Sequence, residues 1–272
     1  IVRLNGHLTE PFPINIGTRQ GDNLSPTIFN IYINDLIKEV NNLGLGVEHA
    51  GMNVSILGYA DDLVLTADSE DDLQTMLNCL HSYCCKWRLS VNAKKTQVMH
   101  FRKATEPQTS QCFTYGNQVI TQTDSYRYLG LNLQYNLDTG KSVDILANAS
   151  SRALASISSK FFSIDGLDYN SFKALYDAVV QPVMNDGAAV WGLKKYDKCQ
   201  TIQKRAIRTF LGVGKTTPIA SIISDMGWTP THIVQKIDAI GYWLRMSRLP
   251  ENRLLFKIFT FEKETAYRHM AM

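Results

Sequence analysis

The chain has 272 residues, 44% of them hydrophobic and 19% charged, a composition that allows a sizeable core and excludes a disordered or fibrous protein. No apolar run is long enough to cross a bilayer, and five cysteines without a CxxC pair argue against a structural zinc site and a secreted disulfide scaffold. The net charge of +3 is unevenly spread: residues 1–139 hold 10 Lys+Arg against 14 Asp+Glu, whereas residues 140–272 hold 18 against 11, which suggests either a polyanionic partner or a basic solvated surface.

The first elements that the sequence predicts are a hairpin and a helix. Asn5-Gly6 is a strong two-residue turn signal between Val2–Leu4 and Leu8. Ile14-Asn15-Ile16 predicts a second extended piece. Ser25-Pro26 predicts a helix start, with Ser25 as the N-cap. The apolar residues that follow recur at helical spacing: Ile28, Phe29, Tyr32, Ile33, Leu36, Ile37 and Val40.

A tight hairpin and the clearest helix of the sequence come next. The apolar strands 54–57 and 63–65 enclose Gly58–Asp62, which leaves room only for a short turn. Ser69 can cap the helix that follows, with Asp72 three residues further on. The expected buried stripe of this helix is Leu73, Met76, Leu77, Leu80, Cys84 and Trp87.

The rest of the chain changes from short strands to helices. Strand ends are expected at residue 91 and over residues 98–101, a surface loop over 103–111, a hairpin over 113–120 that turns at Gly116-Asn117, and a last strand over 126–133. Helices are expected near 142–162, 170–190, 197–211, 217–226 and 230–247, with Pro182 kinking the second. This order predicts an α+β domain joined near residues 134–142 to an all-α domain.

Asp61 and Asp62 are adjacent carboxylates in the turn between two apolar strands. A strand interior would put the two charges on opposite faces of a pleat, whereas at a hairpin tip both can project toward solvent. Two carboxylates held close together repel each other, and Mg²⁺, which takes hard oxygen ligands, relieves that repulsion. For an isolated Asp-Asp pair, an ordinary acidic turn is the alternative, because Asp is a common turn residue.

The segments around this pair resemble a set of family boxes in the family order. Tyr59–Asp62 resembles the Y-x-D-D box of reverse transcriptases, and Arg19–Pro26 resembles the box before it. Phe29–Leu36 is similar to the LINE-type helix, Trp87–Thr96 to the W-x-L-x-x-N-x-x-K-T segment, and Tyr128–Leu131 to the primer-grip box. Over residues 1–135 the chain therefore resembles the reverse transcriptase of a non-LTR (LINE-type) retrotransposon. Group II intron-type enzymes share the YADD box, but the segment at 87–96 and the helical remainder favour the LINE type.

The resemblance implies a partial right-hand polymerase palm over residues 1–138, an antiparallel sheet with packed helices, followed by an all-α thumb and a further segment over residues 139–272. It implies an RNA-directed DNA polymerase, a nucleotidyltransferase that uses an RNA template, a DNA primer and dNTPs and no membrane. Because the chain begins at Ile1 and shows no secretory leader, we expect an intracellular segment of a longer protein, present in nucleus and cytoplasm.

The resemblance also implies two-metal phosphoryl transfer, in which two Mg²⁺ ions about 4 Å apart activate the primer 3′-hydroxyl and steady the leaving pyrophosphate. Asp61 would be the main metal ligand from its box, and Asp62 the second. Gln20 and Gly21 would lie against the incoming nucleotide, where a residue without a side chain permits close approach. Arg19 would contact a phosphate or stay solvated.

Other residues receive roles from the same resemblance. Lys95 matches the family position that protonates the leaving pyrophosphate or holds the triphosphate, with a plain surface lysine as the alternative. Leu129 and Gly130 would grip the primer strand. Tyr59 is expected near the primer end, whereas Phe29 is expected in the core, because aromatic residues at helical spacing are more often buried.

A cationic cluster lies before and along the helix expected at 197–211. Such charges suit a thumb helix that follows the minor groove of a duplex, and a solvated helix face is the alternative. The members of this cluster are Lys194, Lys195, Lys198, Lys204, Arg205 and Arg208.

The family pattern requires a third carboxylate on a strand well ahead of Arg19–Pro26, and we expect that strand and the fingers to lie outside this chain. Because two carboxylates cannot hold two ions properly, we expect little or no polymerase activity from the 272-residue chain alone. Two alternatives stay open. One is a catalytically dead remnant that binds nucleic acid with a steep salt dependence, and the other is an inert relic with exposed sheet edges.

Overall fold

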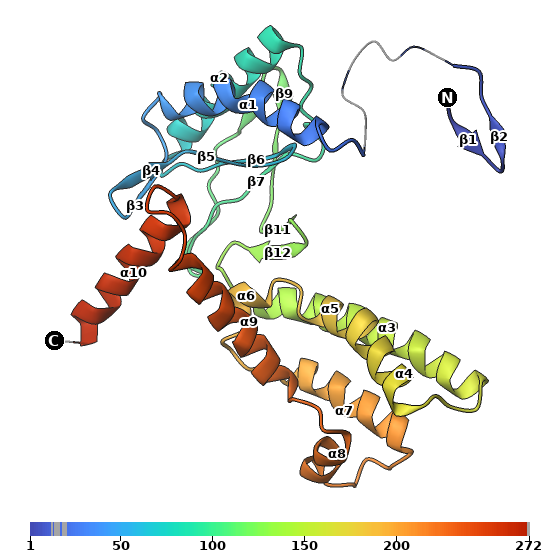
Figure 1. Cartoon of the computed structure of the whole chain (residues 1–272). Helices are drawn as coiled ribbons and strands as arrows, with labels where there is room; N and C mark the ends of the chain where they lie inside the picture. Colours follow the sequence, from blue (N-terminus) through green and yellow to red (C-terminus); the bar gives the residue numbers. More distant parts are fainter. Residues whose placement is uncertain (12, 14–16, 18–20, 271–272) are drawn as a thin grey trace. The chain divides into compact units, whose positions relative to one another are not determined.

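The computed structural model describes residues 1–11, 13, 17 and 21–270, and of residues 266–270 the backbone alone (Figure 1). Residues 1–93 and 111–119 form one compact unit, and residues 94–110 and 120–272 form a second. Strands and helices mix in the first part of the chain and helices alone follow residue 139, so the predicted α+β class is confirmed. The borders between these compact units do not fall between residues 138 and 139, where the palm was expected to end. The division into palm and thumb therefore stays a prediction.

The first unit opens with the predicted hairpin. β1 (Arg3–Leu4) and β2 (His7–Leu8) pair antiparallel around Asn5-Gly6, whose φ angles of 49° and 85° are those of a two-residue hairpin turn. The extended piece predicted at Ile14-Asn15-Ile16 lies outside the described residues. Helix α1 (Ser25–Asn41) is confirmed, but its start differs from the prediction. Leu24 occupies the N-cap position and Ser25 is the first helical residue.

Two hairpins follow α1 in the first unit. β3 (Val47–His49) pairs with β4 (Met52–Val54), and β5 (Ile56–Tyr59) pairs with β6 (Asp62–Leu65). The single strand predicted over 54–57 is therefore wrong, because the chain changes pairing partner at Ser55. The buried Ser55 hydroxyl donates to Asn53 Oδ1 at 2.6 Å, and its carbonyl accepts from Thr66 N–H at 2.9 Å.

Helix α2 (Glu70–Trp87) joins the elements of the first unit. The Ser69 hydroxyl caps it by accepting from Asp72 N–H at 3.1 Å, as predicted. The side-chain amide of Gln74 holds Thr114, donating to its carbonyl and accepting from its N–H at 2.9 Å each. This contact fixes β8 (Thr114–Tyr115), which forms with β9 (Gln118–Val119) the hairpin predicted at Gly116-Asn117. In Figure 1, α1 and α2 lie on the same side of the β5–β6 hairpin.

The second unit contains four short strands. β7 (Gln97–Val98) pairs parallel with β10 (Thr121–Gln122). β11 (Ser125–Tyr128) pairs antiparallel with β12 (Leu131–Gln134). The single strand predicted over 126–133 is therefore wrong. Leu129 and Gly130, with φ angles of 46° and 90°, reverse the chain in its middle.

The helix predicted over 170–190 is divided into several pieces. It consists of α4 (Tyr169–Leu175), a π-helical turn η1 (Tyr176–Val180), α5 (Gln181–Met184) and, after a left-handed Gly187, α6 (Ala188–Trp191). The kink predicted at Pro182 stays a prediction, but a looser π turn lies just before this proline. A proline has no N–H and its ring crowds the carbonyl four residues earlier, and a π turn gives that carbonyl room.

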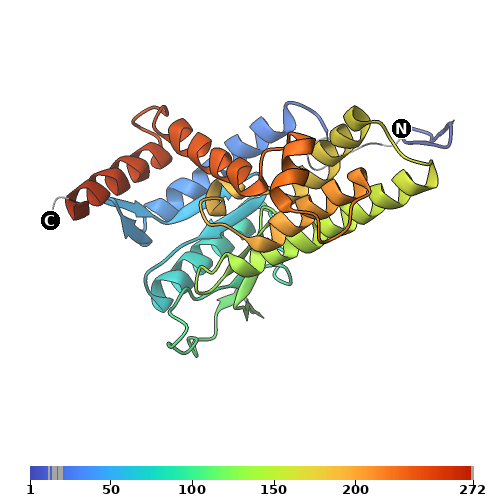
Figure 2. The same ribbon diagram turned by 90° about the horizontal axis from the view of Figure 1, so that it is seen from below.

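The hydrophobic core of the second unit draws its buried residues from the segment between Val143 and Trp228. α3 (Gly140–Ser163) lies beside α7 (Asp197–Leu211), as Figure 2 shows, and α8 (Ile219–Met226), α9 (Thr231–Met246) and α10 (Leu254–Met270) follow. The largest fully buried side chains of this core include Phe172, Tyr176, Leu154, Met184, Ile207 and Ile222. No helix in the described part of the chain is both long and apolar enough to span a membrane.

Candidate active site

The YADD segment forms the tip of the β5–β6 hairpin. Tyr59 pairs directly with Asp62, so Ala60 and Asp61 are the two turn residues. Paired residues of a hairpin present their side chains to the same face, so Tyr59 and Asp62 share a face with Leu57 and its partner Val64. Tyr59 is 65% exposed and Leu57 is 40% exposed, so this is the open face of the hairpin.

The turn that carries Asp61 has an unusual backbone. Ala60 has a φ of 53°, in the left-handed region that residues with a Cβ rarely adopt. The strand geometry forces it there, because a two-residue hairpin turn needs a positive φ at its first position. This strained residue lies between Tyr59 and Asp61, both expected at the active site, and only the shortness of the turn indicated the strain in advance.

Asp61 and Asp62 are both exposed, and neither has an ion-pair partner among the described residues. Two adjacent free carboxylates suit one side of a Mg²⁺ site, because they offer hard, negatively charged oxygens. No group of three or more His, Cys, Asp or Glu side chains that could hold a metal ion occurs within the described residues. The donor set therefore fits part of a magnesium site, which Asp61 and Asp62 would contribute.

The box before α1 is described only in part. Arg19 and Gln20 lie outside the described residues. Gly21 is exposed, has a φ of 83° and has open space where a side chain would be. Asp22 follows and its Oδ1 accepts from Leu24 N–H at 3.2 Å, which turns the chain into α1. Phe29, expected in the core, is half-buried on this helix.

Lys95 belongs to the second unit, in the segment that leads into β7. Its carbonyl lies 3.5 Å from the Tyr126 hydroxyl, so the backbone at Lys95 is held against β11. Its side chain is exposed. The structure thus places Lys95 beside the strand that leads to Leu129-Gly130, and its catalytic role stays a prediction.

Leu129 and Gly130 lie together at the tip of the β11–β12 hairpin. Leu129 is 49% exposed, whereas Gly130 lies against the loop between α5 and α6. A Cβ on Gly130 would come within 3.0 Å of Asp186 Oδ2, at a φ of 90° that disfavours a side chain in any case. Asp186 was missed by sequence reasoning, because nothing in the sequence links it to a hairpin 56 positions away.

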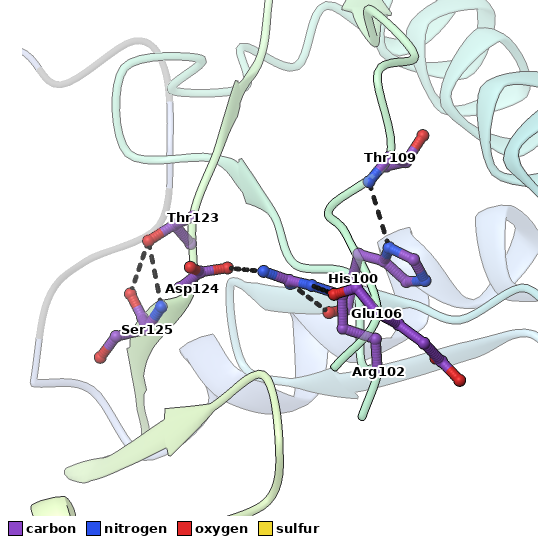
Figure 3. Close-up of polar contacts among 7 residues, drawn as sticks. All are labelled: His100, Arg102, Glu106, Thr109, Thr123, Asp124 and Ser125. Atoms are coloured by element: carbon purple, nitrogen blue, oxygen red, sulfur yellow. Dashed lines mark hydrogen bonds and ion pairs between the residues drawn. The ribbon is translucent and has the colours of Figure 1, made fainter. Parts of the chain in front are cut away.

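Arg102 anchors the base of the same hairpin, and sequence reasoning missed it too (Figure 3). Its side chain is only 7% exposed and donates to Asp124 Oδ1 at 2.8 Å, to the His100 carbonyl at 3.1 Å and to the Glu106 carbonyl at 3.2 Å. The guanidinium also lies 4.2 Å from the ring centre of Tyr135.

These contacts tie three segments of the second unit together. The segment after β7 at His100, the loop after Arg102 and the turn before β11 all meet at one guanidinium (Figure 3). Thr123 continues the turn, since its hydroxyl donates to the Ser125 carbonyl at 2.8 Å and accepts from Ser125 N–H at 3.2 Å. Arg102 therefore fixes where the hairpin that carries Leu129-Gly130 begins.

Half of the predicted cationic cluster is engaged in internal contacts. Lys198 pairs with Asp144 at 2.5 Å, and Arg205 donates to the carbonyl and hydroxyl of Ser151 at 3.0 and 2.9 Å. Arg208 donates to the carbonyls of residues 214, 215 and 217 and closes the loop after α7. Three of the six cations are therefore held by contacts within the chain, and the role of the cluster on a duplex stays a prediction. Lys194 and Lys195, just before the helix, are exposed.

Comparison with known proteins gives one family match and several relatives. The family model described as reverse transcriptase (RNA-dependent DNA polymerase) matches residues 1–133. The "RNA-directed DNA polymerase from mobile element jockey" of Drosophila funebris is 25% identical over 208 residues, covering 73% of this chain and 22% of that protein. The "Retrovirus-related Pol polyprotein from type-1 retrotransposable element R2" of Nasonia vitripennis is 33% identical over 126 residues, covering 42% of this chain and 12% of that protein.

A further relative extends the similarity into the helices. The "Probable RNA-directed DNA polymerase from transposon BS" of Drosophila melanogaster is 23% identical over 218 residues, covering 76% of this chain and 24% of that protein. The chain thus spans about a quarter or less of each of these relatives. The match covers the YADD hairpin and both neighbouring boxes. Over residues 1–133 the chain is therefore similar to the reverse transcriptase (RNA-dependent DNA polymerase) family, and the relatives named above are proteins of non-LTR mobile elements.

Proposed function

We propose that this chain is a segment of the RNA-directed DNA polymerase of a non-LTR retrotransposon and carries out nucleotidyl transfer as part of that enzyme. The observation that carries the proposal is the exposed YADD tip, which has two free carboxylates on a short hairpin within the segment that matches the family. In this proposal, residues 1–138 act as part of the palm and residues 139–272 as the thumb with a following segment.

In this proposal each site residue of the first unit has a role in nucleotidyl transfer. Asp61 and Asp62 hold Mg²⁺, and bound Mg²⁺ would stabilise the charge on the transferred phosphoryl group. Tyr59, on the open face of the same hairpin, lies against the primer end. Arg19, Gln20 and Gly21 contact the incoming nucleotide.

Two further roles fall to residues of the second unit, a proton donor and a pair of residues that holds the primer strand. The Lys95 ammonium donates to the triphosphate or the leaving pyrophosphate, a role that suits a cationic side chain exposed to solvent. Leu129 and Gly130 hold the primer backbone. Leu129 is exposed at the tip of the β11–β12 hairpin, and the contact between Arg102 and Asp124 holds the start of this hairpin.

The second candidate is a nucleic-acid-binding protein without chemistry. The cationic second half of the chain favours it, with 18 Lys+Arg against 11 Asp+Glu over residues 140–272. Such a protein would bind template–primer duplex with a salt dependence set by released counterions, and Asp61 and Asp62 would not matter to it.

The test combines binding with catalysis on the purified 272-residue chain. A labelled DNA primer annealed to an RNA template is titrated in the presence of Mg²⁺ or Mn²⁺, and primer extension is followed in the same samples. Mn²⁺ binding is measured by its paramagnetic broadening of backbone signals, for the unaltered chain and for Asp61→Asn and Asp62→Asn. Asp225→Asn serves as a charge-matched control, because Asp225 lies far along the sequence in α8.

We expect duplex binding, broadening centred on residues 59–63 that both hairpin variants remove, and no primer extension by the isolated chain. Extension that Asp61→Asn abolishes would overturn the expected inactivity and leave the enzyme assignment standing. Duplex binding without any Mn²⁺ effect at the hairpin would favour the second candidate. A chain that binds neither the duplex nor Mn²⁺ would contradict both functions.

A further inference from the structure

Positive charges converge where the end of α6 packs against α9 in the second unit. Gly192 makes the packing close, because a Cβ there would come within 2.3 Å of the Gln235 carbonyl oxygen. This approach of Gly192 to Gln235 brings the loop that carries Lys195, three residues further along, to the part of α9 that holds His232 and Lys236. In keeping with this, the charges of both lysines lower the pKa of His232. His232 and Lys236 are four residues apart and so share one face of the helix.

His232 is oriented by a neutral partner. Its Nδ1 lies 3.3 Å from Oε1 of the buried Gln200 on α7. An amide oxygen only accepts, so Nδ1 carries the proton of the neutral ring and Nε2 is the atom that gains one on protonation. Loss of water on partial burial lowers the pKa of His232, and the charges of Lys195 and Lys236 lower it further.

No acidic side chain balances this group within the described part of the chain. Lys195 and Lys236 are exposed and neither has a carboxylate within ion-pair distance. Elsewhere in the unit, Lys198 pairs with Asp144 and Lys173 with Asp177. The charged groups that act on His232 are Lys195 from the loop after α6 and Lys236 from α9, while α7 contributes the neutral Gln200. Like charges this close destabilise the fold unless an anion joins them.

We propose that Lys195, His232 and Lys236 form a binding site for one phosphate of a nucleic-acid backbone. Two ammonium groups neutralise the phosphodiester charge, and the Nε2–H of protonated His232 donates to a phosphate oxygen. The inference rests on the proposed nucleic-acid function and deepens it, because it assigns the contact to the α6–α9 junction instead of the row of charges along α7.

The site has a pH dependence with a definite sign. In the free chain partial burial, and after it the charges of Lys195 and Lys236, hold the pKa of His232 below its ordinary value, so the neutral ring predominates at pH 7. A bound phosphate reduces the positive charge around the ring, accepts from Nε2–H and raises the pKa of His232, so binding takes up a proton. Affinity therefore rises as the pH falls from about 8 to about 5.5, and the change is lost when His232 cannot titrate.

The test measures the affinity of the whole chain for a short RNA–DNA hybrid duplex by fluorescence anisotropy, at several salt concentrations and at both ends of that pH range. The variants are Lys195→Gln, Lys236→Gln and His232→Gln. Lys160→Gln is the charge-matched control, since Lys160 is exposed near the end of α3. The pKa of His232 is followed by NMR with and without the duplex, and with inorganic phosphate alone to separate a backbone site from a free-phosphate site.

We expect each lysine variant to weaken binding about fivefold and to lower the salt slope by about one. We expect Lys160→Gln to change neither, and His232→Gln to remove the pH dependence. Equal affinity and slope in all variants, with an unchanged His232 pKa on the duplex, would overturn this site and leave the polymerase proposal intact. Proton uptake with inorganic phosphate but not with duplex would overturn the backbone assignment. An unaltered chain that binds no duplex would overturn both.

Discussion

The guanidinium of Arg102 and the carboxylate of Asp124 meet at 2.8 Å at the base of the β11–β12 hairpin, 22 positions apart in the sequence. The arginine side chain is 7% exposed and the aspartate side chain 52% exposed, so the pair joins the interior of the second unit to its surface. A charge in this position needs its partners, because burial without them is costly.

Arg102→Ala is expected to lower the free energy of unfolding of the second unit by about 2 kcal/mol, because it removes the ion pair, two bonds to carbonyls and the contact with Tyr135. Urea denaturation measures the change, and hydrogen exchange over residues 125–134 shows whether the hairpin loosens first. Lys103→Ala, at the exposed neighbouring position, should change neither. An Arg102→Ala chain as stable as the unaltered one would show that the contacts are incidental.

Ala60→Gly is expected to stabilise the first unit by up to about 1 kcal/mol, because glycine adopts the positive φ of this turn without strain. The matched control is Ala67→Gly. Ala67 does not have a positive φ, so glycine there should lower the free energy of unfolding by adding conformational entropy to the unfolded chain. Denaturation of both variants gives the comparison. If both lose stability equally, the turn does not hold Ala60 in the left-handed region.

Gly130→Ala is expected to destabilise the β11–β12 hairpin by about 1–3 kcal/mol, since the new methyl group meets Asp186 Oδ2 at 3.0 Å and the φ is 90°. In the background of Asp186→Ala the cost should fall, because the steric part disappears while the backbone part remains. A double-mutant cycle by denaturation separates the two parts. Additive effects would mean that Gly130 is needed for its φ alone.

The cysteines provide a test of the fold as a whole. Burial raises the pKa of the Cys84 and Cys199 thiols and hides them, whereas Cys85 and Cys112 are exposed. At mildly alkaline pH, a thiol reagent followed by mass spectrometry should modify Cys85 and Cys112 first. Cys84 and Cys199 should react only as urea unfolds the chain. Rapid modification of Cys199 in the native chain would contradict the packing of α7.

Sequence patterns predicted elements that are decided locally. The Ser69 cap of α2, the Asn-Gly and Gly-Asn hairpin turns and most helix positions depend on neighbours a few residues apart, and these were confirmed. The buried stripe predicted for α2 was confirmed except at its ends, where Leu73 is half-buried and Trp87 is exposed. The same patterns did not predict the strand boundaries that depend on residues distant in the sequence. The chain changes from pairing with β3 to pairing with β6 at Ser55, whose carbonyl accepts from the N–H of Thr66. Leu129-Gly130 reverses the chain within a run of residues that looks like one continuous strand.

The candidate site shows the same division. The YADD turn and the hairpin character of its strands could be predicted from spacing, and so could the family that the boxes indicate. The supports of the site could not. Arg102 with Asp124, Gly130 with Asp186, and His232 with Lys195 are pairs that only the folded chain brings together.

The π turn η1 explains a periodicity in the sequence around it. Phe172, Tyr176, Val180, Met184 and Ala188 are all buried, at a strict interval of four. In a regular α-helix each step of four residues overshoots a full turn by about 40°, so such a series would spiral away from the core within two or three turns. The looser π turn winds less per residue and cancels most of that drift. A four-residue repeat of apolar residues that continues past a proline is therefore a pattern by which an underwound helix could be sought in other sequences.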